Sequence, residues 1–184
     1  MSWPGEARRS LLASWLLFLR RPQGYALLDL SEAGFWRSFS AILLVAPLYL
    51  WASRLEARLP GQEAPAPSIG WDLFGLLLQW FGWPLIVAGL ARLAGLTQGF
   101  VRYVVAYNWS SVLVMAAFLP PMLLYGAGLV GAGVVFTLSL AALLASLYYR
   151  WHIARSAFET QGAVAFALVL ADLVLGIAVN RLVG

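Results

Sequence analysis

The amino-acid sequence predicts an all-α membrane protein with about five transmembrane helices and an N-terminal amphipathic helix that lies at the membrane interface. Hydrophobic residues make up 62% of the 184 positions and charged residues only 11%, whereas a soluble domain is roughly half apolar and about a quarter charged. The segment from Tyr103 to Tyr149 contains no Asp, Glu, Lys or Arg. Because one crossing needs about 20 apolar residues, this segment holds two crossings and a turn.

The first 34 residues are expected to form a cytoplasmic, interfacial segment. Their apolar stretch, Leu11 to Leu19, is bounded by arginine pairs, and no cleavage motif follows it, so we expect it to stay attached. It is too short to cross a hydrocarbon core of about 30 Å, because a helix rises only about 1.5 Å per residue. A helix over about 6–20 instead presents an apolar stripe to the membrane, with two serines opposite, formed by Leu11, Leu12, Trp15, Leu16 and Leu19.

The transmembrane domain, residues 35–184, contains five apolar segments. Ser31 is expected to cap the helix that leads into the first span. Pro120 and Pro121 are expected to stop the third span, because proline lacks the N–H that a helix needs. The predicted spans are Phe35–Ala52, Leu73–Leu90, Tyr103–Leu119, a fourth that begins among the glycines of 126–133 and reaches Tyr149, and Ala163–Val179.

The arginines orient these helices. Three of the twelve, Arg54, Arg58 and Arg181, fall on one side of the predicted membrane. The other nine share the side of the N-terminus: Arg8, Arg9, Arg20, Arg21, Arg37, Arg92, Arg102, Arg150 and Arg155. The positive-inside rule therefore predicts a cytoplasmic N-terminus and a periplasmic C-terminus.

The composition also bears on source and partners. All basic residues are arginine, and Ala, Leu and Gly are abundant, which suggests a GC-rich bacterial genome and hence the bacterial cytoplasmic (inner) membrane. The arginines are scattered near helix ends and form no basic stripe, so nucleic-acid binding is rejected. The expected partners are membrane lipids and other membrane-protein subunits.

Glycines indicate where helices approach each other closely. Gly75, Gly82 and Gly89 recur every seven residues in the second span, and Gly128 and Gly131 precede the fourth. Small residues let helix backbones come together inside a membrane. We expect these glycines to pack against another helix, either of this chain or of a partner.

Asp172 is an acid well inside the fifth span, and its face continues through Gly176 and Asn180. A charge there costs about 2.5–3.5 kcal/mol on insertion scales, so it needs partners within the protein. The candidates are polar residues of the second and third spans: Gln79, Tyr107, Asn108 and Ser111. This group is interpreted either as a polar staple between helices, which we prefer because proton relays need several titratable groups, or as a proton or solute pathway.

Deep aromatic residues offer a further interpretation, while catalysis has no support. Trp80, Trp83 and Trp109 lie inside spans and either pack or line a site for a lipid, quinone or pigment. The sequence has no Cys and one His, so no metal site and no cofactor are expected. It also lacks paired carboxylates, a His with a nearby nucleophile and a phosphate-binding glycine loop, so we expect no enzyme activity.

Two sequence stretches carry a resemblance to a known family. The first runs from Phe35-Trp36-Arg37-Ser38-Phe39 to Pro47, and the second is Tyr107-Asn108-Trp109-Ser110. With the five spans, they resemble bacterial members of the Yip1-like family of small membrane proteins. The eukaryotic signature Asp-Leu-x-Gly-Pro is echoed by Asp72-Leu73-Phe74-Gly75, without the proline and before the second span instead of the first. For eukaryotic members the resemblance implies binding of small GTPases in membrane traffic, a role that need not apply to a bacterial chain.

Three functions remain open from the sequence. The preferred one is a non-enzymatic accessory or assembly subunit of a larger membrane complex, or a membrane-organising scaffold. The second is a small proton-coupled or solute transporter centred on Asp172, which a polar cavity beside that carboxyl group would favour. The third is a lipid, quinone or pigment binder that uses the deep tryptophans.

Overall fold

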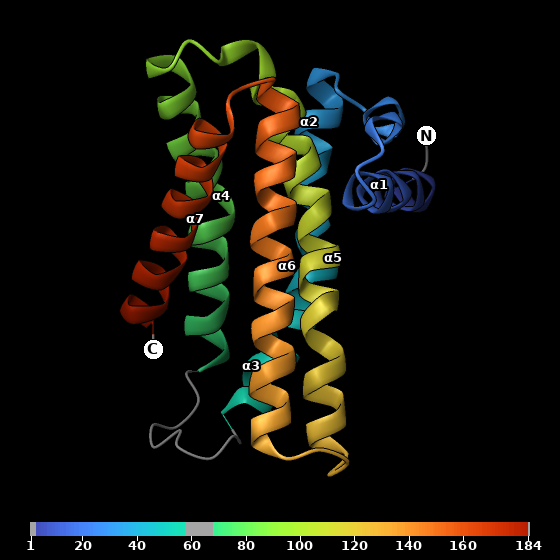
Figure 1. The fold of residues 1–184 in the computed structure, drawn as a ribbon, viewed down its shortest axis with the longest axis vertical. Helices are drawn as coiled ribbons and strands as arrows, with labels where there is room; N and C mark the ends of the chain where they lie inside the picture. The colour runs from blue at the N-terminus through green and yellow to red at the C-terminus, as the bar shows by residue number, and fades with distance from the viewer. Residues whose placement is uncertain (1–2, 58–67, 184) are drawn as a thin grey trace.

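The computed structural model describes residues 3–57 and 68–183, and every regular element in these ranges is helical (Figure 1). Five helical segments are long and apolar enough to cross a membrane, which confirms the predicted five-span, all-α fold. These segments are Glu32–Glu56, Ile69–Leu93, Thr97–Gly126, Ala132–Phe158 and Gly162–Val183.

The helices run up and down in one bundle, with α5 and α6 as a long antiparallel hairpin (Figure 1). Gly128 lies in the turn of this hairpin with φ +70°, a conformation that glycine adopts without strain. The elements are α1 Trp3–Phe18, η1 Pro22–Leu27, α2 Glu32–Ser38, η2 Phe39–Ala41, α3 Ile42–Glu56, α4 Ile69–Leu93, η3 Thr97–Gly99, α5 Phe100–Gly126, α6 Ala132–Phe158 and α7 Gly162–Val183.

Serine side chains cap two of the helices. The Ser31 hydroxyl accepts a hydrogen bond from the backbone N–H of Gly34 at 3.1 Å, as the sequence predicts. At the start of α4, the Ser68 hydroxyl accepts a hydrogen bond from the backbone N–H of Trp71 at 3.3 Å. Each cap satisfies a backbone donor that the first turn of a helix leaves without a partner.

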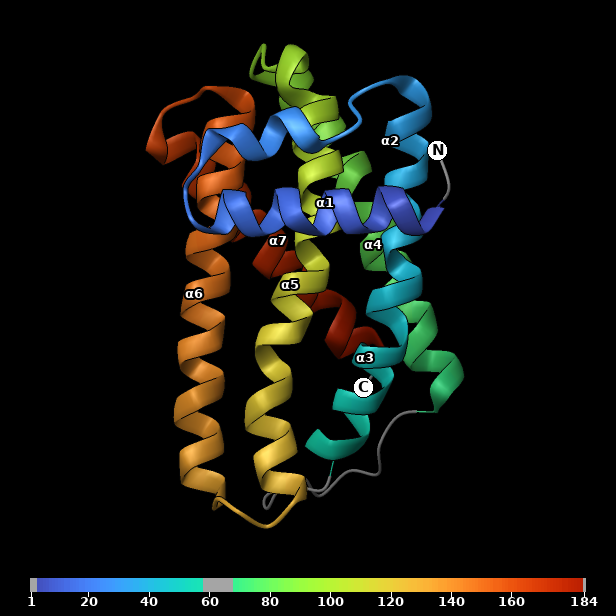
Figure 2. The ribbon, with the colours of Figure 1, turned by 90° about the vertical axis from the view of Figure 1, so that its right-hand side faces the viewer.

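The predicted end of the third span was wrong. Pro120 and Pro121 do not stop α5, which continues to Gly126. Proline removes backbone hydrogen bonds from a helix. Inside a membrane, a neighbouring helix and small backbone adjustments compensate for that loss. The long hairpin with α6 supplies such a neighbour on one side of α5 (Figure 2).

The helix α1 lies across the side of the bundle, nearly perpendicular to α5 and α6 (Figure 2). The two serines opposite its apolar stripe, Ser10 and Ser14, are buried against the bundle. The Tyr149 hydroxyl donates to the Ser14 carbonyl at 2.6 Å, which fixes the helix at that height. Small side chains are buried here because they let α1 approach the bundle closely.

The predicted stripe of α1 therefore points away from the bundle. Its most exposed members are Leu12, Trp15 and Leu19, while Leu11 and Leu16 are partly buried. An exposed apolar stripe of this kind is what a membrane surface covers. That α1 is an interfacial amphipathic helix stays a prediction.

Ionic contacts tie α1 to α2. The Arg37 guanidinium donates to Glu6 of α1 at 2.6 Å and to Asp29 at 2.5 Å. Glu6 is only 3% exposed, so it needs this partner. Hydrogen bonds from the Ser31 hydroxyl and N–H, with a smaller contribution from Arg37, hold the pKa of Asp29 below its ordinary value.

Candidate intramembrane polar site

Asp172 lies in the middle of α7 and has partners on two other helices. The Tyr107 hydroxyl of α5 donates to one carboxylate oxygen at 2.8 Å. Arg150 of α6 places its Nε 3.6 Å from the other oxygen, and the two side chains are 15% and 9% exposed. A carboxylate at this depth is stable only with such partners.

Arg150 was predicted just after the end of the fourth span, and the structure shows that its side chain turns into the bundle and is only 15% exposed. The helix α6 continues beyond the predicted span end at Tyr149 to Phe158, about two and a half turns further. The guanidinium of Arg150 lies over the Tyr107 ring, 4.0 Å from its centre, and Nη2 donates to Ser111 at 3.3 Å. Its Nη1 is buried without a hydrogen-bond partner in the described part of the chain.

Two adjoining cavities, of about 320 and 360 Å³, lie against this pair. They extend from Arg150 along α7 toward its C-terminal end, where Asn180 lies. The first also touches Trp80, Tyr107 and Ser111, and the second touches Asp172 and Arg181. Polar or small residues shared by both are Gln79, Arg150, Gly176 and Asn180.

The cavity lining is rich in hydrogen-bond donors and carries more positive than negative charge. Arg150 and Arg181 face a single lining carboxylate, Asp172. The indole N–H of Trp80, like Nη1 of Arg150, is buried without a partner among the described residues. An unpaired buried donor costs about 1–3 kcal/mol, or more if charged, so such donors indicate a place for an acceptor group.

Most of the predicted polar residues meet here. Tyr107, Ser111 and Gln79 lie at the site, as do Gly176 and Asn180. Asn108 does not: its amide donates to Ser38 at 2.9 Å, on the side of α5 that faces α2. Adjacent residues of one helix point about 100° apart, so Asn108 cannot share the face of Tyr107.

The sequence contained a signal for Arg150 that the span assignment missed. In an antiparallel hairpin that turns near Gly128, residues equally distant from the turn lie side by side. Arg150 then falls opposite the segment from Tyr107 to Ser111, which is where the structure places it. Hairpin register predicts this contact, whereas hydropathy alone does not.

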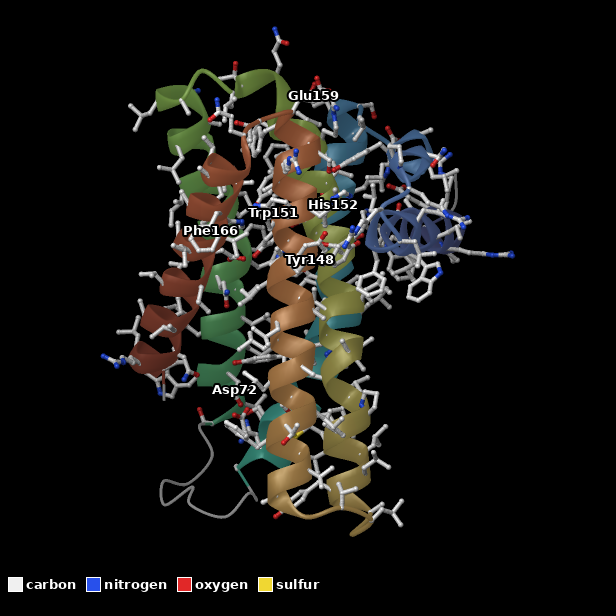
Figure 3. All side chains as sticks on the ribbon, viewed as in Figure 1. Asp72, Tyr148, Trp151, His152, Glu159 and Phe166 are labelled. Atoms are coloured by element: carbon white, nitrogen blue, oxygen red, sulfur yellow. The ribbon has the colours of Figure 1, made fainter. Side chains whose placement is uncertain are left out.

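A second charged pair joins α3 and α4 near the end of the bundle opposite α1, where Figure 3 labels Asp72. Arg54 pairs with the Asp72 carboxylate, and Ser53 donates to it at 3.2 Å. Asp72 stands just before the predicted second span, and it is only 3% exposed. This pair fixes α3 to α4 and does not line either cavity.

The predicted packing glycines differ in what surrounds them. A Cβ on Gly75 would lie 3.0 Å from Val183, so α4 and α7 make a close contact there. Gly82 and Gly89 have no such neighbour within 4 Å. Gly128 lies in the turn before α6 and Gly131 caps α6, also with no neighbour that a Cβ would meet.

The deep tryptophans also separate into two kinds. Trp83 donates to the Tyr103 hydroxyl at 2.9 Å, and Trp109 is buried in the core at 1% exposure. Both therefore pack inside the bundle. Trp80 lines the first cavity.

Comparison of the chain with protein-family models, curated proteins and solved structures finds no match. The resemblance to the Yip1-like family stays a prediction.

Proposed function

We propose that this five-span membrane protein binds a small anionic solute at Arg150 and carries it across the membrane, without acting as an enzyme. The observation that carries the proposal is the pair of cavities beside a buried guanidinium with an unpartnered donor. The proposed setting is the bacterial inner membrane, with the end that bears α1 in the cytoplasm.

The volume beside the ion pair argues against a purely structural role. Both cavities are partly open to the surface of the bundle, so a solute can reach the guanidinium of Arg150 through them. A staple between helices needs no adjoining space, whereas a binding site does. The staple was preferred because Asp172 has no titratable neighbours for a proton relay, and Arg150 at 3.6 Å supplies instead a fixed positive charge that an anion can bind.

The chemistry of the lining favours an anion. A guanidinium presents donors in a fixed fork that matches a carboxylate or phosphate. In Arg150, Nε faces Asp172, Nη2 faces Ser111 and Nη1 is left for a ligand. Cavities of about 320 and 360 Å³ lie at the small end of ligand sites, so the solute is small.

Flux into vesicles tests this function. The purified protein is reconstituted into liposomes, and uptake of labelled acetate, succinate and inorganic phosphate is compared with uptake of choline and glucose. We expect uptake of at least one anion above protein-free liposomes, lost in Arg150→Gln and kept in Arg92→Gln, whose arginine is exposed on α4. Correctly folded protein that moves none of the three anions would contradict the proposal.

A second candidate function is an accessory subunit of a larger membrane complex. It is favoured by the side of α4 at Gly82 and Gly89, where no atom of the described residues lies within 4 Å of an added Cβ. Lipid fills such a groove poorly, and a partner helix fills it well. Native purification with identification of co-purifying membrane proteins tests this role, and recovery of the protein alone would count against it.

A further inference from the structure

A separate, apolar groove of about 340 Å³ runs between α6 and α7. Figure 3 labels Tyr148 and Trp151 along α6 and Phe166 across from them on α7. The groove shares Leu147 and Leu173 with the second polar cavity. The complete lining is Leu147, Tyr148, Trp151, Phe166, Val169, Leu170 and Leu173.

Two arginines lie on the aromatic residues of this groove. The guanidinium of Arg20 is 4.9 Å from the centre of the Tyr148 ring, and that of Arg155 is 5.4 Å from the Trp151 ring. The two rings are 5.6 Å apart. Both guanidinium groups also lie close enough to His152 to interact with it electrostatically. Arg20 and Arg155 thus form one cationic patch beside the groove.

This cationic patch has no internal counter-charge. Within residues 3–57 and 68–183, no carboxylate forms an ion pair with Arg20 or Arg155. Both residues are exposed. An anion that binds between the two guanidinium groups offsets the repulsion between them, so the patch favours a negatively charged ligand.

The aromatic wall is held in place before any ligand arrives. The Trp151 indole donates to the Gly162 carbonyl at 2.9 Å, and a Cβ on Gly162 would lie 3.3 Å from the same ring. The glycine therefore lets the chain pass close to the indole. A preformed groove binds with less loss of conformational freedom than one that must assemble.

We propose that this groove is a binding site for an anionic phospholipid, with one acyl chain along the apolar lining and the phosphate at Arg20 and Arg155. The groove lies on two membrane-spanning helices, so an acyl chain is its natural apolar neighbour. Arginine binds phosphate through paired donors. Because Arg20 follows α1, the bound lipid joins the segment after α1 to α6.

Quenching of Trp151 by brominated lipid tests the site. The full-length protein and its Trp151→Phe variant are placed in vesicles that contain equal fractions of phosphatidylglycerol and phosphatidylcholine. One of the two lipids is dibrominated in each experiment. The difference between protein and variant isolates Trp151 from the other tryptophans. We expect its quenching by brominated phosphatidylglycerol to exceed that by brominated phosphatidylcholine by at least about twofold.

Two variants and one control make the result specific. Arg20→Gln with Arg155→Gln should make the two lipids quench equally, whereas Arg21→Gln with Arg92→Gln, which removes the same charge elsewhere, should keep the preference. Leu170→Phe, which fills the groove and leaves the arginines, should also lower it. Equal quenching in the unaltered protein, or a preference that survives loss of Arg20 and Arg155, would overturn the proposal.

Discussion

Arg150 and Asp172 form a charged pair between α6 and α7 inside the bundle. Burial of one charge without the other is costly, whereas an ion pair replaced as a unit by neutral side chains is often tolerated. Asp172 was identifiable from the sequence because an acid inside a span needs a partner. Arg150 was missed because an arginine after an apolar segment is typical of a membrane boundary, although the register of the α5–α6 hairpin places it opposite Tyr107.

Because only an unpaired charge is costly, single and double variants of this pair can separate its effect on stability from its effect on anion uptake. Arg150→Met should lower the free energy of unfolding by roughly 3 kcal/mol, because Asp172 loses its cation. Adding Asp172→Asn should restore most of that loss, since the amide oxygen still accepts from Tyr107, while anion uptake stays absent. Unfolding in a denaturing-detergent titration gives the free energies. A double variant as unstable as Arg150→Met would contradict the ion-pair interpretation.

Tyr25 gives the contact between η1 and α6 a pH dependence. Its hydroxyl bonds to Ser156 at 2.8 Å, and burial raises the pKa of Tyr25 to about 12 from 10.0. The neutral phenol is the bound form, so its stabilisation is complete below about pH 10 and is lost between about pH 10 and 12. A spin label at Arg8→Cys on α1 should gain mobility over that range.

Tyr25→Phe is the control for this titration. It lacks the ionisable hydroxyl, so the gain in mobility centred between the two pKa values should disappear. An identical alkaline transition in Tyr25→Phe would assign it to another group.

Two similar substitutions at glycines of α4 should differ in their effect on stability. Gly75→Leu should destabilise the bundle by about 1–3 kcal/mol, because its side chain would overlap Val183. Gly82→Leu should leave the stability of the isolated chain unchanged, because nothing in residues 3–57 and 68–183 lies within 4 Å of its Cβ position. Thermal unfolding of the purified variants measures both. Equal destabilisation by the two substitutions would contradict the packing described for α4.

If a partner helix covers the open side of α4, Gly82→Leu should instead weaken that complex. Co-purification of partner proteins with the unaltered protein and with Gly82→Leu measures this effect. A loss of partner without a loss of stability would support the accessory role. Equal recovery of a partner with both forms would rule out a contact at Gly82.

The number of helical spans was predictable because it depends on segment length and apolarity. Helix ends and buried faces were less predictable because they depend on tertiary contacts. Ser31 capped its helix as expected because capping is local. Pro120 and Pro121 failed to end α5 because a membrane helix tolerates prolines that would end a helix in water. The burial of Ser10 and Ser14 was not predictable from α1 alone, since it depends on the surface of α5 and α6.

The antiparallel bundle keeps most arginines at one end, which gives the whole chain a predicted orientation. Since the sequence has no cysteine, single thiols report on sidedness. Gln98→Cys lies near the end that bears α1, and Ala127→Cys lies at the α5–α6 turn. In intact bacterial cells, an impermeant maleimide should label Ala127→Cys and spare Gln98→Cys. The reverse pattern would invert the orientation.

Access of an anion to the polar cavities is the central claim, and a thiol at Asn180, which lines both, measures it most directly. Asn180→Cys in the otherwise cysteine-free protein is reacted with a sulfonate-bearing and an ammonium-bearing methanethiosulfonate of similar size. The account predicts faster reaction with the sulfonate, and loss of that preference when Arg150→Gln is added but not when Arg92→Gln is added. Equal rates for both reagents, or a preference unchanged by Arg150→Gln, would contradict it.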